Sequence, residues 1–225
     1  YERGNPVTQL VVSGETKRRG TKVRFKPDPQ IFETMEYSFD TLSQRLRELS
    51  FLNKGLLITI EDERNNKRNE FEYKGGIISF VEHLNKNKTP LHDPIYFEGD
   101  RDMVHIEVAM QYTDSYNENT YTFANNINTY EGGTHLIGFK SALTRTVNNY
   151  ITANNLLKGL KENLEGDDIR EGLTVVISVK IPQPQFEGQT KMKLGNSEVK
   201  GFVESLVNER LAMFLEENPN VAKKI

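Results

Sequence analysis

A short polar loop between a β-prone run and a long helical segment carries the residues best suited to chemistry. Residues 173–180 are expected to form a strand, and a helix is expected from Ser197 onward. The loop between them holds an amide, a hydroxyl and two ammonium groups, on Gln189, Thr190, Lys191 and Lys193. The first N–H groups of a helix lack intrahelical partners and favour anions, phosphate above all. We therefore expect a phosphate contact through Lys191, with Gln189 as a second donor.

The local pattern leaves a plainer interpretation open, in which Lys191 is an ordinary solvated lysine beside a helix start. The spacing of the loop matches no general phosphate signature such as the Walker loop. The chain also contains no Gly-x-Ser-x-Gly elbow and no dinucleotide fingerprint. Residue types alone therefore predict anion binding but no reaction.

Two further segments are of interest, and a structural interpretation is open for each. Thr21 lies in an alternating run that predicts a strand, where a β-branched residue is common. Gly132 and Gly133 could cradle a phosphate, or they could form a strand-to-helix turn that Thr134 caps.

Charged residues elsewhere admit a functional and a structural interpretation. On the helix after Thr134, Arg145 lies opposite the apolar stripe and Lys140 lies at its border. These cations could belong to a solvated helix face, or they could contact a polyanion if the helix lined a cavity. The charged run Asp167, Asp168, Arg170 and Glu171 is better explained by a helix cap with a local ion pair than by a metal or acid–base pair. The histidines show no ligand spacing and the chain has no cysteine, so we predict no metal site.

Hydrophobic periodicity predicts the elements that position these residues. Strands are expected at 7–13, 21–25, 56–61, 70–73, 103–112, 120–125 and 173–180, and helices at 39–53, 77–85, 134–153 and 197–217. Ser38 or Asp40 is expected to cap the first helix, and Ser197 is expected to cap the last. The expected apolar stripe of the first helix is Leu42, Leu46 and Leu49. Residues 87–94 read as a linker-like loop and 154–168 as a polar, mobile segment. The order is not a regular βαβα alternation, so the fold class is α+β, with a boundary at Gly75–Gly76.

Bulk composition excludes several classes. The net charge is −3 and the pI about 5.9, which argues against strong general nucleic-acid affinity while leaving room for a local basic lining. The absence of cysteine excludes disulfides and fits a reducing compartment. No apolar run reaches membrane-spanning length, and no signal-peptide core is present. The chain starts at Tyr1 without an initiator Met, so we expect a fragment or a processed chain.

An ordered set of segments resembles the B subunits of the type II topoisomerases, those of bacterial DNA gyrase in particular. The landmarks run along the whole chain: 20–25, 45–53, 73–77, 126–135, 166–173 and the loop at Gln189. Residues 138–145, Gly-Phe-Lys-Ser-Ala-Leu-Thr-Arg, are more similar to gyrase than to the B subunit of the related topoisomerase IV.

The resemblance implies a fold and a division of the chain. Residues 1–75 would be the C-terminal part of a GHKL ATPase domain, and residues 76–225 a transducer domain. The family's transducer is α+β with a left-handed βαβ crossover, an uncommon hand.

The resemblance also implies roles for single residues. Thr21 matches a threonine of the adenine pocket. Gln189 and Lys191 match residues that reach the γ-phosphate of ATP. Lys140 matches a basic position facing the central DNA cavity, with Arg145 a weaker addition.

The family's catalytic glutamate, its magnesium-binding asparagine, its adenine-binding aspartate and its glycine-rich lid all precede the Gly20–Thr21 motif. We therefore expect ATP and Mg²⁺ as cofactors of the intact protein and no ATP hydrolysis by this chain alone, with metal ligands absent from it. The implied partners are DNA, the gyrase A subunit and a second copy of the gyrase B protein on ATP binding, in the cytoplasm and without a membrane. Alternatives are the corresponding protein of topoisomerase IV, a non-catalytic binding or dimerisation module, and a nucleic-acid-binding domain.

Overall fold

The computed structural model describes residues 1–156 and 163–225. The chain forms two compact units, 1–42 and 43–225. The predicted mobility of 154–168 falls partly on residues outside the described ranges. The predicted domain boundary at Gly75–Gly76 stays a prediction.

The N-terminal unit forms no strand, so the strands predicted at 7–13 and 21–25 are wrong. The apolar side chains of these two segments, such as Val12 and Val23, are exposed. A strand is stabilised by pairing and by burial of one face, and neither occurs within this unit.

Helix α1 (Phe39–Leu52) begins in the first unit and continues into the second. Its start is capped as expected, because the Ser38 hydroxyl accepts a hydrogen bond from the Thr41 N–H at 3.2 Å. The predicted stripe of Leu42, Leu46 and Leu49 is wrong, since the buried residues are Ser43, Ser50, Phe51 and Leu52. The antiparallel hairpin of β1 (Ile58–Asp62) and β2 (Lys67–Phe71) follows, as the sequence predicts.

A five-stranded sheet forms the centre of the larger unit, in the order β3-β4-β7-β5-β6. It consists of β3 (Ile95–Arg101), β4 (Val104–Tyr112), β5 (Asn119–Ala124), β6 (Ile127–Asn128) and β7 (Leu173–Lys180). All neighbours are antiparallel except β5 and β7, which are parallel. The chain therefore crosses over from β5 to β7 through helix α3 (Thr134–Ala153) and the short α4 (Gly166–Arg170). The left hand of this crossover stays a prediction.

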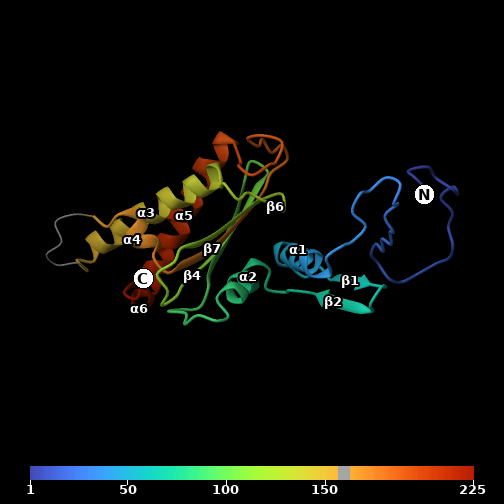
Figure 1. Cartoon of the computed structure of the whole chain (residues 1–225). Coiled ribbons are helices and arrows are strands. Elements are labelled where there is room, and N and C mark those ends of the chain that lie inside the picture. The colour runs from blue at the N-terminus through green and yellow to red at the C-terminus, as the bar shows by residue number, and fades with distance from the viewer. Residues whose placement is uncertain (157–162) are drawn as a thin grey trace. The chain divides into compact units, whose positions relative to one another are not determined.

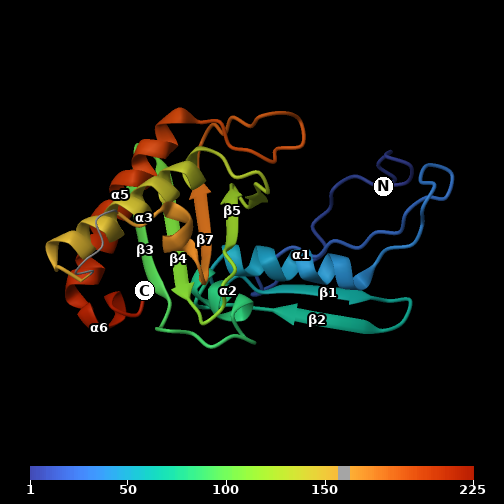
Figure 2. The same ribbon diagram turned by 60° about the vertical axis from the view of Figure 1, so that its left-hand side comes forward.

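Helices cover both faces of the sheet (Figures 1 and 2). Helices α3 and α5 (Ser197–Glu217) pack on one face, where alternate residues of β4 from Val104 to Tyr112 are buried. Helix α2 (Ile77–Leu84) and the end of α1 pack on the other face, against Ala109, Phe123 and Val176. The α+β class is confirmed, and so is the predicted alternation of β4.

Several helix ends differ from expectation. Helix α5 starts at Ser197, but its N-cap position is Asn196, so the predicted Ser197 cap is wrong. The charged run near Asp168 does form a cap: the Asp168 carboxylate accepts a hydrogen bond from the Glu165 N–H at 3.0 Å, and Arg170 pairs with Asp167. Pro219 starts the short α6 (Pro219–Ala222). None of the described helices has the length and apolar character that crossing a bilayer requires.

Candidate functional site

The loop predicted to bind phosphate, residues 185–195 (the lysine loop), folds back on itself as a narrow hairpin. The Gly195 N–H donates to the Gln185 carbonyl at 2.8 Å, and the Glu187 N–H donates to the Lys193 carbonyl at 2.9 Å. Gly188, with φ of 80°, makes the turn at its tip, where Gln189 and Lys191 are exposed. The two predicted phosphate-binding side chains therefore project from the same exposed tip.

Three backbone hydrogen bonds fasten the base of the lysine loop to the segment that starts α3. The Leu194 N–H donates to the Gly132 carbonyl, and the Leu194 carbonyl accepts from the Thr134 N–H, both at 3.0 Å. The Glu131 N–H adds a bond to the Met192 carbonyl at 3.0 Å. Leu194 itself is buried in the main core. A displacement of the loop would therefore pull on the start of α3.

Glycine at position 133 permits this attachment. Its backbone has φ of 132° and ψ of −160°, a region that side chains rarely adopt. A Cβ atom there would lie 2.3 Å from the Leu194 carbonyl oxygen and 2.5 Å from its nitrogen. The glycine pair is thus a strand-to-helix turn that receives another backbone. The alternative of a phosphate cradle loses support, because the first N–H of α3 is already bonded to the loop.

The expected Thr134 cap is wrong, since α3 has no side-chain cap and the Thr134 hydroxyl is buried without a hydrogen-bond partner among the described residues. At the other end of the loop, sequence reasoning missed Asn196. Its buried side chain accepts from the Gln185 N–H at 2.7 Å and donates to the Gln183 carbonyl at 3.2 Å. An asparagine at the junction of a loop and a helix was the available signal, because its amide can bond in both directions.

Of the two lysines in this loop, Lys191 is the one whose ammonium group is not paired with a carboxylate of the described residues. Lys193 pairs with Glu187 at 3.1 Å. The Lys191 ammonium lies 6.0 Å from the centre of the Phe186 ring, and no carboxylate of the described residues pairs with it. Its backbone has φ of 57°, a left-handed conformation that costs an L-residue about 1–2 kcal/mol. Strain of this kind gathers at functional positions, so it motivates a role for Lys191.

The remaining predicted site residues lie elsewhere. Thr21 is exposed in the N-terminal unit and outside any strand, so its expected position in a sheet is wrong, while its adenine-pocket role stays a prediction. On α3, the Arg145 guanidinium donates to the Asn208 side chain at 3.3 Å at the surface of the protein. The Lys140 ammonium is 2.7 Å from the Glu118 carboxylate.

Glu118 joins two cations in one network. Arg170 lies 3.0 Å from the same carboxylate. Burial raises the pKa of Glu118, but hydrogen bonds from Lys140, Thr120 and Arg170 outweigh it and hold that pKa below its usual range. Lys140 is therefore largely neutralised within the protein, which leaves Arg145 as the more accessible cation of the pair.

A buried histidine next to the loop attachment predicts sensitivity to acid. His135 is fully buried in the first turn of α3, and burial lowers its pKa to about 4. The folded state therefore binds a proton less readily than the unfolded chain, and stability falls as the pH drops from about 6.5 towards 4. We expect about 2–3 kcal/mol of unfolding free energy to be lost between about pH 7 and pH 4.5 through this group.

Urea unfolding at both pH values measures this loss of unfolding free energy. His135→Gln cannot titrate and should show a flatter dependence, whereas parallel curves would refute this assignment.

One group of possible metal ligands was missed by the sequence. Glu98 on β3 pairs directly with Glu107 on β4, and His105 lies two residues from Glu107 on the same face. One ligand atom of each lies within 4.8 Å of the others, the only such group among the described residues. The prediction of no metal site rested on spacing along the chain. Because β3 was assigned to no strand, its register with β4 could not be used.

Comparison with known proteins places this geometry in a family. Residues 76–225 match the family model described as DNA gyrase B. The whole chain is 57% identical to the DNA gyrase B protein of Bacillus mycoides, and 59% identical to that of Myxococcus xanthus. It spans 56% of the first relative and 28% of the second.

Solved structures agree. The 43K ATPase domain of Thermus thermophilus gyrase B, in complex with an aminocoumarin, superimposes with a TM-score of 0.79 at 41% identity, over 89% of this chain and 54% of that one. The topoisomerase IV ATP-binding domain of Francisella tularensis gives a TM-score of 0.74 at 28% identity, over 88% and 54%. The chain thus combines a lysine loop fastened to α3 with a fold that superimposes on gyrase B ATPase domains. It belongs to the DNA gyrase B family.

Proposed function

We propose that this chain is part of the ATP-operated clamp of a type II topoisomerase, and that its lysine loop senses the γ-phosphate of bound ATP. The observation that carries this proposal is the tip of the loop. Lys191 there holds an exposed ammonium group on a strained backbone, without a carboxylate partner in the described part of the chain. Gln189, exposed two positions earlier in the same loop, offers an amide donor. A terminal phosphate is the anion that two such donors would bind in a nucleotide-operated protein.

The attachment of the loop suggests how binding is transmitted. A ligand shifts an equilibrium between two conformations only by its differential affinity for them. A γ-phosphate would bind Lys191 and Gln189 in one position of the loop, and the backbone bonds between Leu194 and Gly132–Thr134 would carry that position to α3. In this account residues 76–225 act as the transducer, and residues 1–75 complete the ATPase domain, with Thr21 in its adenine pocket.

Magnesium is expected to accompany ATP and to neutralise phosphate charge. The lysine loop does not fit such an ion, because it presents ammonium groups and its Glu187 carboxylate is already paired with Lys193. We assign no magnesium ligand to the loop. ATP hydrolysis then depends on groups other than Lys191, whose ammonium can stabilise phosphate charge but cannot orient the attacking water.

The remaining partners follow from the same proposal: DNA, a gyrase A subunit and a second copy of the gyrase B protein, in the cytoplasm. The surface position of the Arg145 guanidinium supports a contact with DNA, while the pairing of Lys140 with Glu118 weakens the case for that lysine.

A chimera tests the function. This chain replaces the matching segment of the Myxococcus xanthus gyrase B protein, to which it is 59% identical. Combined with a gyrase A subunit, the chimera should supercoil DNA in an ATP-dependent manner. A folded chimera that binds ATP but shows neither hydrolysis nor supercoiling would contradict the proposal. The isolated chain should not hydrolyse ATP.

A further inference from the structure

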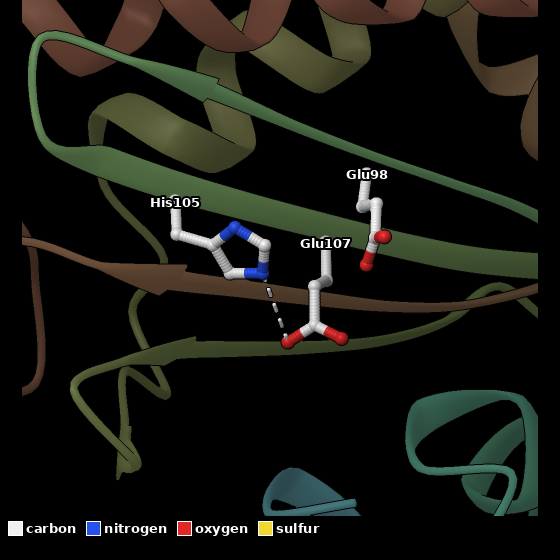
Figure 3. Close-up of side chains that lie close together, drawn as sticks. All are labelled: Glu98, His105 and Glu107. Atoms are coloured by element: carbon white, nitrogen blue, oxygen red, sulfur yellow. Dashed lines mark ion pairs between the residues drawn. The ribbon is translucent and has the colours of Figure 1, made fainter.

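We propose that Glu98, His105 and Glu107 form a binding site for a divalent transition-metal ion on the α2-side face of the sheet. The site is independent of the lysine loop and of the proposed ATP-dependent function. Figure 3 shows the three side chains side by side on one face of the sheet, with a dashed line marking the ion pair between His105 and Glu107. The donor set, one imidazole and two carboxylates, suits Zn²⁺, Co²⁺ or Mn²⁺, with water completing the coordination.

The sheet itself brings the ligands together. Glu98 and Glu107 are directly opposite in the antiparallel register of β3 and β4, and cross-strand neighbours have Cβ atoms about 4.5–5.5 Å apart. His105 projects from the same face of β4 because strand side chains alternate with a period of two. Two rigid strands thus supply all three donors, and only side-chain torsions need to change to bring them to metal-ligand distances.

His105 is held in the tautomer that a metal requires. Its Nδ1 lies 2.9 Å from the Asp100 carboxylate. A carboxylate that is ionised can only accept, so Nδ1 carries the proton and the neutral ring has its lone pair on Nε2. That nitrogen faces Glu107, at 3.8 Å from its carboxylate. A carboxylate that fixes the other nitrogen of an imidazole is the usual support for a metal-binding histidine.

The two carboxylates are also positioned, and the one ammonium that pairs with either of them among the described residues, that of Lys180, lies at the long distance of 4.0 Å. The Tyr96 hydroxyl lies between the two carboxylates, 2.5 Å from that of Glu98 and 3.2 Å from that of Glu107, and its single proton is positioned to donate to the nearer one. The Glu107 side chain is only 13% exposed, yet its nearest described ammonium, that of Lys180, is 4.0 Å away. A metal ion bound directly to this half-buried carboxylate would lie closer to it than the Lys180 ammonium does and would stabilise its charge. Lys180 is 46% exposed and can turn into solvent when a metal binds.

Metal titration of the full chain tests this proposal. After chelator treatment, calorimetry with Zn²⁺ should give one site per chain, and Co²⁺ should give visible d–d absorption bands. His105→Gln and Glu107→Gln should each weaken binding by at least about 10-fold, and Asp100→Asn by about 10- to 100-fold, the range for a residue that orients a ligand. His83→Gln is the matched control, because His83 is an exposed histidine outside the site, and it should leave binding unchanged.

Folding is checked by circular dichroism in chelator. If His105→Gln or Glu107→Gln does not fold, Glu98→Gln replaces it, since Glu98 is exposed and outside the core. Equal Zn²⁺ affinity in wild type and in the folded ligand variants would overturn the proposal. Absence of binding by the wild-type chain, or an equal loss in His83→Gln, would overturn it as well.

Discussion

Gly133→Ala should detach the lysine loop from the start of α3. The new Cβ would lie 2.3 Å from the Leu194 carbonyl oxygen, and that atom belongs to backbone that cannot turn aside. The variant also places a side chain at φ of 132°. Backbone strain and overpacking each cost about 1–3 kcal/mol, so we expect a loss of roughly 3–5 kcal/mol of unfolding free energy. Urea unfolding measures this loss, and hydrogen exchange at 186–195 measures release of the loop.

Gly188→Ala is the matched control for this prediction. It lies in the same loop and also has positive φ, 80°, but its new Cβ would meet nothing within 4 Å. It should therefore cost only about 1–2 kcal/mol, the penalty of the left-handed conformation. Similar costs for the two variants would show that the contact with Leu194 does not fasten the loop.

Lys191→Ala in the chimera should lower ATP turnover by about 10- to 150-fold. Loss of a hydrogen bond to a charged group typically costs about 1.5–3 kcal/mol, which converts to that range. The fold should be unaffected, because the side chain is exposed and its ammonium lies 6.0 Å from the centre of the Phe186 ring, too far for a strong contact. Steady-state hydrolysis with excess ATP, together with the melting temperature, measures both effects.

Two variants sharpen this prediction. Lys191→Arg keeps a cation at the tip and should restore part of the turnover. Lys193→Ala removes a second lysine of the loop that is already paired with Glu187, so its effect should be much smaller. If Lys191→Ala and Lys193→Ala reduce turnover equally, the loop would supply only general positive charge.

The sequence predicted the elements whose pattern is long and whose partners are close along the chain. The apolar spacing in 134–153 and 197–217, and the alternation of 103–112, correctly indicated α3, α5 and β4. The segment 7–13 and the alternating run 21–25 were also predicted to be strands, and they do not form strands in this structure. Periodicity reports which side chains could share a face, and it does not report whether another strand is there to pair.

The candidate site was predictable in its chemistry but not in its supports. The residue types and the position of the loop before a helix pointed to Lys191 and Gln189. The fastening of Leu194 to Gly133 depends on segments far apart in sequence, and the role of Asn196 depends on how the loop turns back. Strand β3 was missed because its acidic residues and glycine interrupt the apolar pattern. Without β3, its pairing with β4, which brings the three possible metal ligands together, could not be predicted.

If the lysine loop senses ATP as proposed, Lys191 distinguishes ATP from ADP by contact with the γ-phosphate. The most direct test is the affinity of the chimera for a non-hydrolysable ATP analogue and for ADP, measured with wild-type Lys191 and with Lys191→Ala. We predict that the variant binds the analogue about 10-fold or more weakly, as the loss of one charge-assisted contact implies, while its affinity for ADP is unchanged. An equal loss for both nucleotides, or no loss for either, would contradict the proposed role of Lys191.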